Sequence, residues 1–179
     1  MKLLVIFITA FQSYAQAAPH PMTGSSFINQ VHSGSVFSQM GFQIKNVPSD
    51  WLLKNPITTQ TQVIEIAPSS STTKAVLSFT TEKVSAKTDL EKYVRQYLRD
   101  YNQYGFEVIG LQSLKQTGIN SVVVDLAQKN KATKSRQVFF KKDDRIVLAT
   151  CVDSFSKFNK TILTCNAILD TFQWRPIIL

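Results

Sequence analysis

The chain has 179 residues, enough for one domain with a sizeable core, and it is 44% hydrophobic and 18% charged, which excludes an intrinsically disordered protein. Its net charge of +8 and its pI near 9.6 favour an acidic partner. The two histidines, His20 and His32, both lie near the N-terminus, which argues against histidine-based catalysis or metal binding in the rest of the chain.

The first seventeen residues have the three parts of a cleavable secretory signal peptide. Lys2 supplies the positive charge, residues 3–11 form an apolar run, and Ala15-Gln16-Ala17 is a small-x-small cleavage site. The run is shorter than the roughly 20 residues that span a bilayer, and no later stretch approaches that length. We therefore expect a signal peptide over residues 1–17, no transmembrane segment in the mature chain and a periplasmic or secreted protein. A buried N-terminal strand or helix is the alternative.

Residues 18–40 are rich in Ser, Gly, Gln and His without a sustained apolar period, which predicts a flexible segment. A single folded domain is expected over residues 41–179. Its first predicted elements are a strand at 42–47, a capped helical turn at 49–53 and two strands at 62–67 and 74–84.

Residues 89–104 have the clearest helical period, with apolar and tyrosine side chains at steps of three and four. Thr88 and Glu91 match a capping box at the start of this helix, and Gly105 is suited to end it. The tyrosines on this stripe form either a contact surface or a part of the core with hydroxyls at the rim. They are Tyr93, Tyr97, Tyr101 and Tyr104.

Four more strands and a second helix complete the prediction. Strands connected by short turns form a largely antiparallel sheet, and both helices bury their apolar stripes against it, which gives an α+β sandwich. The predicted strands span residues 106–115, 120–128, 137–141 and 145–152, and the predicted helix spans 156–174.

Cys151 in the last predicted strand and Cys165 on the apolar stripe of the last helix remain after signal cleavage. An even cysteine count in an exported chain favours a disulfide, and packing of the helix on the strand would bring the two together. Two free buried thiols are the alternative. No metal site is expected, because no histidine follows His32 to complete a ligand set.

A concentration of positive charge occurs in residues 129–145, which hold seven basic residues and two carboxylates. It is either a binding patch for an anionic partner, such as lipid headgroups, acidic polysaccharide or an acidic protein, or a solvated loop that protects a sheet edge. Export argues against nucleic acid. The seven residues are Lys129, Lys131, Lys134, Arg136, Lys141, Lys142 and Arg145.

The order of these elements resembles the PsbP-like fold family, which includes the extrinsic oxygen-evolving subunit of photosystem II and a nuclear-import cofactor that binds a Ran-type GTPase. The resemblance implies a three-layer αβα sandwich around an antiparallel sheet, no common active site, and a role as a binding or assembly partner of larger complexes. The two cysteines and the basic hairpin depart from the family's usual pattern, and no partner-binding residue is transferred. The residues that carry the resemblance are Phe42, Ile44, Pro48, Trp51, Leu90, Tyr93, Val94, Gly118 and Phe172.

Signatures of catalysis and nucleotide binding do not occur: there is no Gly-x-Ser-x-Gly elbow and no glycine-rich phosphate loop. We predict no catalytic residue, no metal and no cofactor, and an exported, non-catalytic binding or accessory protein of the cell envelope with a protein partner. The alternatives are a peripheral binder of anionic lipid or glycan and a secreted hydrolase with an unrecognised site. A carboxylate pair for glycoside chemistry stays open as an alternative, although Glu65, Glu82, Glu107 and Asp125 are interpreted more simply as outward strand positions.

Overall fold

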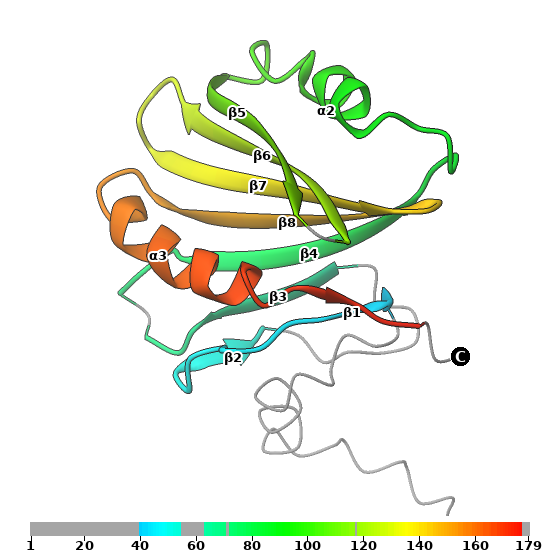
Figure 1. The fold of residues 1–179 in the computed structure, drawn as a ribbon. Helices are drawn as coiled ribbons and strands as arrows, with labels where there is room; N and C mark the ends of the chain where they lie inside the picture. The colour runs from blue at the N-terminus through cyan, green and yellow to red at the C-terminus, as the bar shows by residue number, and fades with distance from the viewer. Residues whose placement is uncertain (1–39, 55–62, 71, 117, 177–179) are drawn as a thin grey trace, which may run out of the picture.

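The computed structural model places most of the predicted domain (Figure 1). The predicted signal peptide and the segment that follows it, up to residue 39, lie outside the described residues, so both remain predictions. Nowhere in the described part of the chain is there a helix long and apolar enough to cross a bilayer. The described residues are 40–54, 63–70, 72–116 and 118–176.

A seven-stranded antiparallel sheet in the order β2-β3-β4-β8-β7-β6-β5 forms the central layer. The strands β5 to β8 follow one another as a meander, and β4 pairs with β8, so that β2 and β5 are the two edges (Figure 1). The strands are β2 (Trp51–Leu53), β3 (Val63–Pro68), β4 (Val76–Lys83), β5 (Phe106–Gln116), β6 (Ile119–Gln128), β7 (Thr133–Lys142) and β8 (Arg145–Ser154).

Helix α2 (Leu90–Leu98) covers one face of the sheet, which we call the α2 face. Its buried residues Leu90, Val94 and Leu98 recur at four-residue steps and form one apolar stripe. The alternation of β6 turns every second side chain toward that stripe. The sheet residues packed in this cluster are Val122, Val124, Leu126, Phe139 and Ile146.

Helix α3 (Phe158–Leu169) and the two-stranded ribbon of β1 (Phe42–Gln43) with β9 (Gln173–Trp174) cover the opposite face, which we call the α3 face (Figure 1). Aromatic rings join these elements to the sheet. Phe172 stacks on Phe140 with ring centroids 3.9 Å apart, and Phe42 lies between Phe172 and Phe79 at 5.4 and 5.2 Å. The helices therefore lie on both sides of an antiparallel sheet, and the predicted α+β, three-layer αβα class is confirmed.

A disulfide between Cys151 and Cys165 joins β8 to α3, with the two Cα atoms 6.3 Å apart. Both residues are fully buried. Cys151 lies on the same face of β8 as Val147 and Ala149, and Cys165 is on the side of α3 that faces them. The cysteines meet as the sequence predicted.

A buried aspartate, Asp153, ties three segments together next to this disulfide. Its Oδ2 accepts hydrogen bonds from the Thr161 hydroxyl of α3 at 2.6 Å and from the Thr73 hydroxyl, which precedes β4, at 3.1 Å. Its Oδ1 accepts from the Ser154 amide at 2.6 Å. Burial raises the pKa of Asp153, but these hydrogen bonds together outweigh burial, and the pKa lies below its ordinary value.

Three local predictions are wrong, one in the type of element and two in where the element ends. Residues 49–53 are not a helical turn, because Trp51–Leu53 pairs with β3 as a strand. The strand predicted at 42–47 stops after Gln43, and Asn46 has a positive φ of 57°. Helix 156–174 covers only Phe158–Leu169, and the chain then turns into β9.

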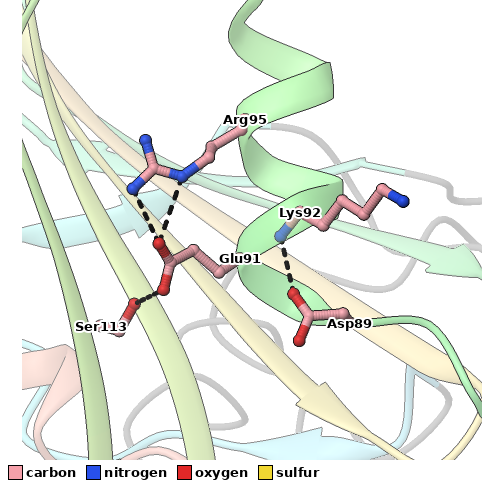
Figure 2. Close-up of polar contacts among 5 residues, drawn as sticks. All are labelled: Asp89, Glu91, Lys92, Arg95 and Ser113. Atoms are coloured by element: carbon pink, nitrogen blue, oxygen red, sulfur yellow. Dashed lines mark hydrogen bonds and ion pairs between the residues drawn. The ribbon is translucent and has the colours of Figure 1, made fainter.

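The first helix is also shorter than predicted, and its cap is different (Figure 2). The N-cap is Asp89, whose Oδ1 accepts from the Lys92 amide at 2.8 Å, so the Thr88–Glu91 capping box is wrong. Glu91 instead accepts from Arg95 one turn on, at 2.7 Å, and from the Ser113 hydroxyl of β5, at 2.9 Å. Glu91, which the sequence assigned to the capping box, thus holds α2 against β5 at the edge of the sheet.

Reduction of the disulfide should lower the free energy of unfolding by about 3 kcal/mol, because the bond closes a loop of about 15 residues in the unfolded chain. Urea unfolding with and without reductant, paired with mass measurement after thiol labelling, tests this. Two labels gained without prior reduction would show that the bond is absent.

Asp153→Asn should destabilise the protein most near neutral pH. Since the folded pKa of Asp153 is lowered, its contribution is present above the unfolded pKa of about 4 and is lost as pH falls through the folded pKa. Urea unfolding from pH 7 down to pH 3 should show the two stabilities converging. Asp50→Asn, an exposed position, controls for net charge. A difference that widens toward acid would contradict the assignment.

Candidate binding sites

Each helix covers only part of its face of the sheet, and a hollow remains beside each one. Helix α3 lies against β7 and β8, and α2 lies against β6 and β7. The hollow beside α3 is here called the groove, and the hollow beyond the end of α2 is called the tyrosine pocket.

The groove is a cavity of about 620 Å³ on the α3 face. Strands β5, β6 and β7 form its floor, and α3 forms one wall. The groove extends to β5, which is an edge strand of the sheet. Its surface is mixed, with apolar residues such as Val123 and Leu114 beside the polar Gln112 and Asn166.

An ion pair between Asp125 of β6 and Arg136 of β7 lies at the groove floor. The two residues are direct cross-strand partners, and the contact is bidentate: Nε to Oδ1 at 2.8 Å and Nη2 to Oδ2 at 2.9 Å. The third guanidinium nitrogen, Nη1, donates to Asn166 Oδ1 of α3 at 3.2 Å. The hydrogen bond to Asp125 raises the pKa of Arg136, burial acts against it, and the carboxylate charge adds to the increase.

A β-bulge in β5 lies at the outer edge of the groove floor. The register of β5 against β6 shifts between Val108 and Gly110, so Ile109 is an extra residue. Gly110 lies opposite Asp125, and a Cβ there would contact the Asp125 carboxylate at 3.5 Å. Val108 and Ile109 keep 42% and 48% exposure, which leaves apolar surface at the edge strand.

The structure does not gather the seven predicted basic residues on one surface. Lys129 and Lys131 lie around the β6–β7 turn, while Lys142 and Arg145 flank the β7–β8 turn at the other end of β7. The ten residues of β7 separate these turns by about 33 Å at roughly 3.3 Å per residue. The predicted patch is therefore divided between two ends of the sheet.

Most of these basic residues contact groups of the same chain. Arg136 pairs with Asp125, Lys134 lies over the Phe158 ring at 5.5 Å, and Arg145 lies over the Trp174 ring at 5.5 Å. The Nζ atoms of Lys129 and Lys141 donate to backbone carbonyl oxygens. Within the described residues, Lys131 and Lys142 alone among the seven make no side-chain hydrogen bond, ion pair or ring contact. Binding of an anionic partner stays a prediction.

The tyrosine stripe predicted on the first helix lies at the margin of the core: Tyr93 and Tyr101 are half-buried against it, and Tyr97 is 38% exposed. Tyr93 and Tyr97 pack edge-on against the Phe139 ring, and Tyr101 packs against Phe106. Tyr104 is 71% exposed and lies at the rim of the tyrosine pocket. In the part of the chain that the structure describes, His, Cys, Asp and Glu side chains nowhere gather in a group of three that could hold a metal ion.

Solved structures similar to this chain share its architecture at low sequence identity. The cyanobacterial PsbP protein CyanoP of Synechocystis matches 75% of this chain and 86% of its own, with a TM-score of 0.56 at 9% identity. The chain has a PsbP-like fold. No protein-family model matches it, and neither does any curated protein.

Two further neighbours share the PsbP-like fold. A Pseudomonas aeruginosa protein of unknown function matches 70% of this chain and 98% of its own, with a TM-score of 0.55 at 16% identity. LpqN of Mycobacterium tuberculosis, a protein involved in cell envelope biogenesis, matches 75% and 83%, with a TM-score of 0.54 at 17% identity. At these identities the likeness establishes the fold alone, and the resemblance recognised in the sequence is confirmed at that level.

The Asp125–Arg136 pair is not apparent from the sequence. The sequence predicts an outward position for Asp125 and a basic patch for Arg136, whereas each side chain is about a quarter exposed, at 26% and 27%. Strand alternation in β6 could have indicated the groove position of Asp125, because Asp125 lies on the same side of the strand as Ser121 and Val123. What the sequence could not supply was the β6–β7 register that brings Arg136 opposite it.

Arg136→Met should lower the free energy of unfolding by about 1 to 2 kcal/mol, because it leaves a part-buried carboxylate without its cation. Arg95→Met is the matched control. It breaks the exposed Arg95–Glu91 pair, with side-chain exposures of 62% and 45%, and should cost clearly less stability than Arg136→Met because solvent screens the pair. Urea unfolding measures both. Equal losses in the two variants would contradict the special role of the groove pair.

Proposed function

We propose that this protein is an exported, non-catalytic accessory protein of the cell envelope that binds a protein partner along the groove. The observation that carries the proposal is the continuity of the groove with the edge strand β5. One side of β5 pairs with β6, and within the described residues no strand pairs with its other side. An edge strand beside a hollow is a typical site for an extended segment of a partner.

The geometry of β5 favours its second half for such pairing. The bulge at Ile109 interrupts the regular ladder, and from Gly110 onward the register with β6 is continuous to Gln116. An added strand could bond to the backbone of this half, and its alternate side chains would enter the groove over Gly110 and Gln112. The polar floor at Asp125 and Arg136 would select among those side chains.

Three observations support the envelope as the location. The sequence predicts a signal peptide at residues 1–17, and Cys151 and Cys165 form a disulfide, a bond that persists in oxidising compartments. The fold neighbour LpqN is involved in cell envelope biogenesis. Together they support our proposal that the protein is periplasmic or secreted.

Anionic lipid or glycan is the second candidate ligand, at the β7–β8 turn. Lys142 and Lys83 both lie opposite Arg145 in the sheet, so three cationic residues adjoin across three strands. Such a cluster attracts an anionic surface, and its binding weakens as salt screens the charges. The carboxylates of Asp143 and Asp144 in the same turn reduce its net charge.

A photocrosslinking amino acid at Gln112, on the groove side of β5, should capture a specific protein when the tagged chain is returned to its native envelope. The matched control carries the same group at Gln96, which is exposed on α2. Mass spectrometry should identify one protein that Gln112 captures and Gln96 does not, at both low and high salt.

Two outcomes would contradict the proposal. Equal capture at both positions, or none at either, would remove the groove as the contact site. Recovery of lipid or glycan in place of protein, lost at high salt, would favour the cationic cluster at the β7–β8 turn.

A further inference from the structure

Four turns lie next to one another at one end of the central sheet, and we call them the turn row (Figure 1). They are residues 72–75 before β4, residues 155–157 between β8 and α3, residues 129–132 between β6 and β7, and residues 99–105 between α2 and β5. Each turn is hydrogen-bonded to the next: the Lys157 Nζ donates to the Thr72 carbonyl oxygen, the Phe155 amide to that of Ala132 at 3.1 Å, and the Lys129 amide to that of Gly105 at 2.9 Å. The turn row is therefore one continuous surface.

The turn row carries positive charge that no carboxylate neutralises. All twelve Asp and Glu residues of the chain lie in its described part, and none of them forms an ion pair with the four exposed lysines of the row. Lys129 and Lys157 donate to neutral carbonyl oxygens, which leaves their charge in place. The one carboxylate in the row, Asp100, pairs with Arg99 at 3.1 Å. The four lysines are Lys74, Lys129, Lys131 and Lys157.

The charges of the elements that adjoin the turn row balance one another. Asp50 before β2 and Glu107 of β5 are negative, and Lys134 of β7 and Lys160 of α3 are positive. Asp153 of β8 is fully buried and hydrogen-bonded inside the protein. The surface charge at this end of the sheet is therefore that of the four lysines.

Two aromatic side chains are exposed in the same row. Tyr104 is 71% exposed and Phe155 is 38% exposed. Exposed aromatic groups beside cations are typical of proteins that contact a membrane surface, because aromatic rings favour the interfacial layer and lysines attract anionic headgroups. The β7–β8 turn at the other end of the sheet differs, since residues 142–145 include Asp143 and Asp144 and no apolar residue.

We infer that the turn row docks on the surface of an anionic lipid bilayer. The lysines contact the headgroups, and Tyr104 and Phe155 enter the interfacial layer. A protein partner is a poorer match, because protein interfaces are depleted in lysine and centre on one packed cluster, whereas these two rings lie in separate turns. Docking by one end of the sheet leaves both of its faces free, so this inference is independent of the protein partner proposed at the groove.

Sedimentation with lipid vesicles tests the inference on the exported, oxidised chain. One set of vesicles contains equal parts of phosphatidylglycerol and phosphatidylcholine, and the other contains phosphatidylcholine alone. The chain should bind the anionic vesicles at least about tenfold more tightly than the neutral ones, and added salt should reduce that ratio because it screens the lysines.

Lys74→Gln combined with Lys131→Gln should weaken binding to the anionic vesicles about thirtyfold, since each lysine near an anionic surface contributes about one tenfold step or slightly less. Lys83→Gln combined with Lys142→Gln is the matched control. It removes the same charge at the far ends of β4 and β7. Binding should then change less than about threefold, because the length of the sheet exceeds a Debye length of about 10 Å.

Tyr104→Ser combined with Phe155→Ser should weaken binding several-fold at every salt concentration while the charge is unchanged. Both side chains are exposed, and Tyr104→Ser alone supplies the aromatic test if the double variant does not fold. A photocrosslinking amino acid at Tyr104 should capture lipid from the native envelope.

Four results would overturn the inference. They are no preference for the anionic vesicles, equal losses in the two lysine variants, full binding by a folded variant that lacks the aromatic side chains, and capture of an acidic protein in place of lipid at Tyr104. The crosslinking result at Gln112 is separate, because that residue faces the groove.

Discussion

The constraint on which the rest of this structure depends is the mismatch in length between its helices and its strands. Helix α2 has nine residues and is about 14 Å long at 1.5 Å per residue, while ten-residue strands such as β7 extend about 33 Å. Neither helix can therefore cover its face of the sheet. Both hollows follow from this shortfall: the groove beside α3 and the tyrosine pocket beyond the end of α2.

Different strands are left uncovered on the two faces of the sheet, because different elements pack on each face. On the α3 face, the β1–β9 ribbon adds Phe42 and Phe172 to the helix, and the disulfide fixes α3 on β8. This closes the half of the sheet that contains β3, β4 and β8 and leaves β5 and β6 open. On the α2 face, Glu91 holds the helix to β5 through Ser113, so the open end is instead over β7 and β8.

The sequence predicted that the long elements exist but not where they end: β7 spans Thr133–Lys142 where a strand is predicted at 137–141, and both helices are shorter than predicted. It was insufficient for the short elements. Strands β6 and β8 are each ten residues long and rich in β-branched and aliphatic residues, which is typical of a strand. Strand β2 has three residues, Trp51–Leu53, too few to show a period, and the preceding Ser49-Asp50 imitates a helix cap. Tyr101 and Tyr104 continue the period of α2 in the sequence although the helix ends at Leu98, so the period alone does not show where the helix ends.

The site residues were harder to predict, because their contacts depend on strand register and packing and not on the local sequence pattern. Asp125 and Arg136 are eleven residues apart in sequence, and only the register of β6 against β7 makes them partners. The hydrogen bond between Gln137 and Tyr101 likewise depends on packing and not on a sequence pattern. The disulfide was the exception, because both cysteines lie on faces that alternation and helical period define.

The pleat of β7 connects the two hollows. Arg136 and Gln137 are consecutive, so their side chains point to opposite faces, one into the groove and one into the tyrosine pocket. Each is held by a partner on its own side, Arg136 by Asp125 and Gln137 by Tyr101. Since β7 is paired on both edges, by β6 and by β8, its backbone resists displacement. A ligand on one face therefore has little means to move the other, and the two hollows can evolve separate specificities on one strand.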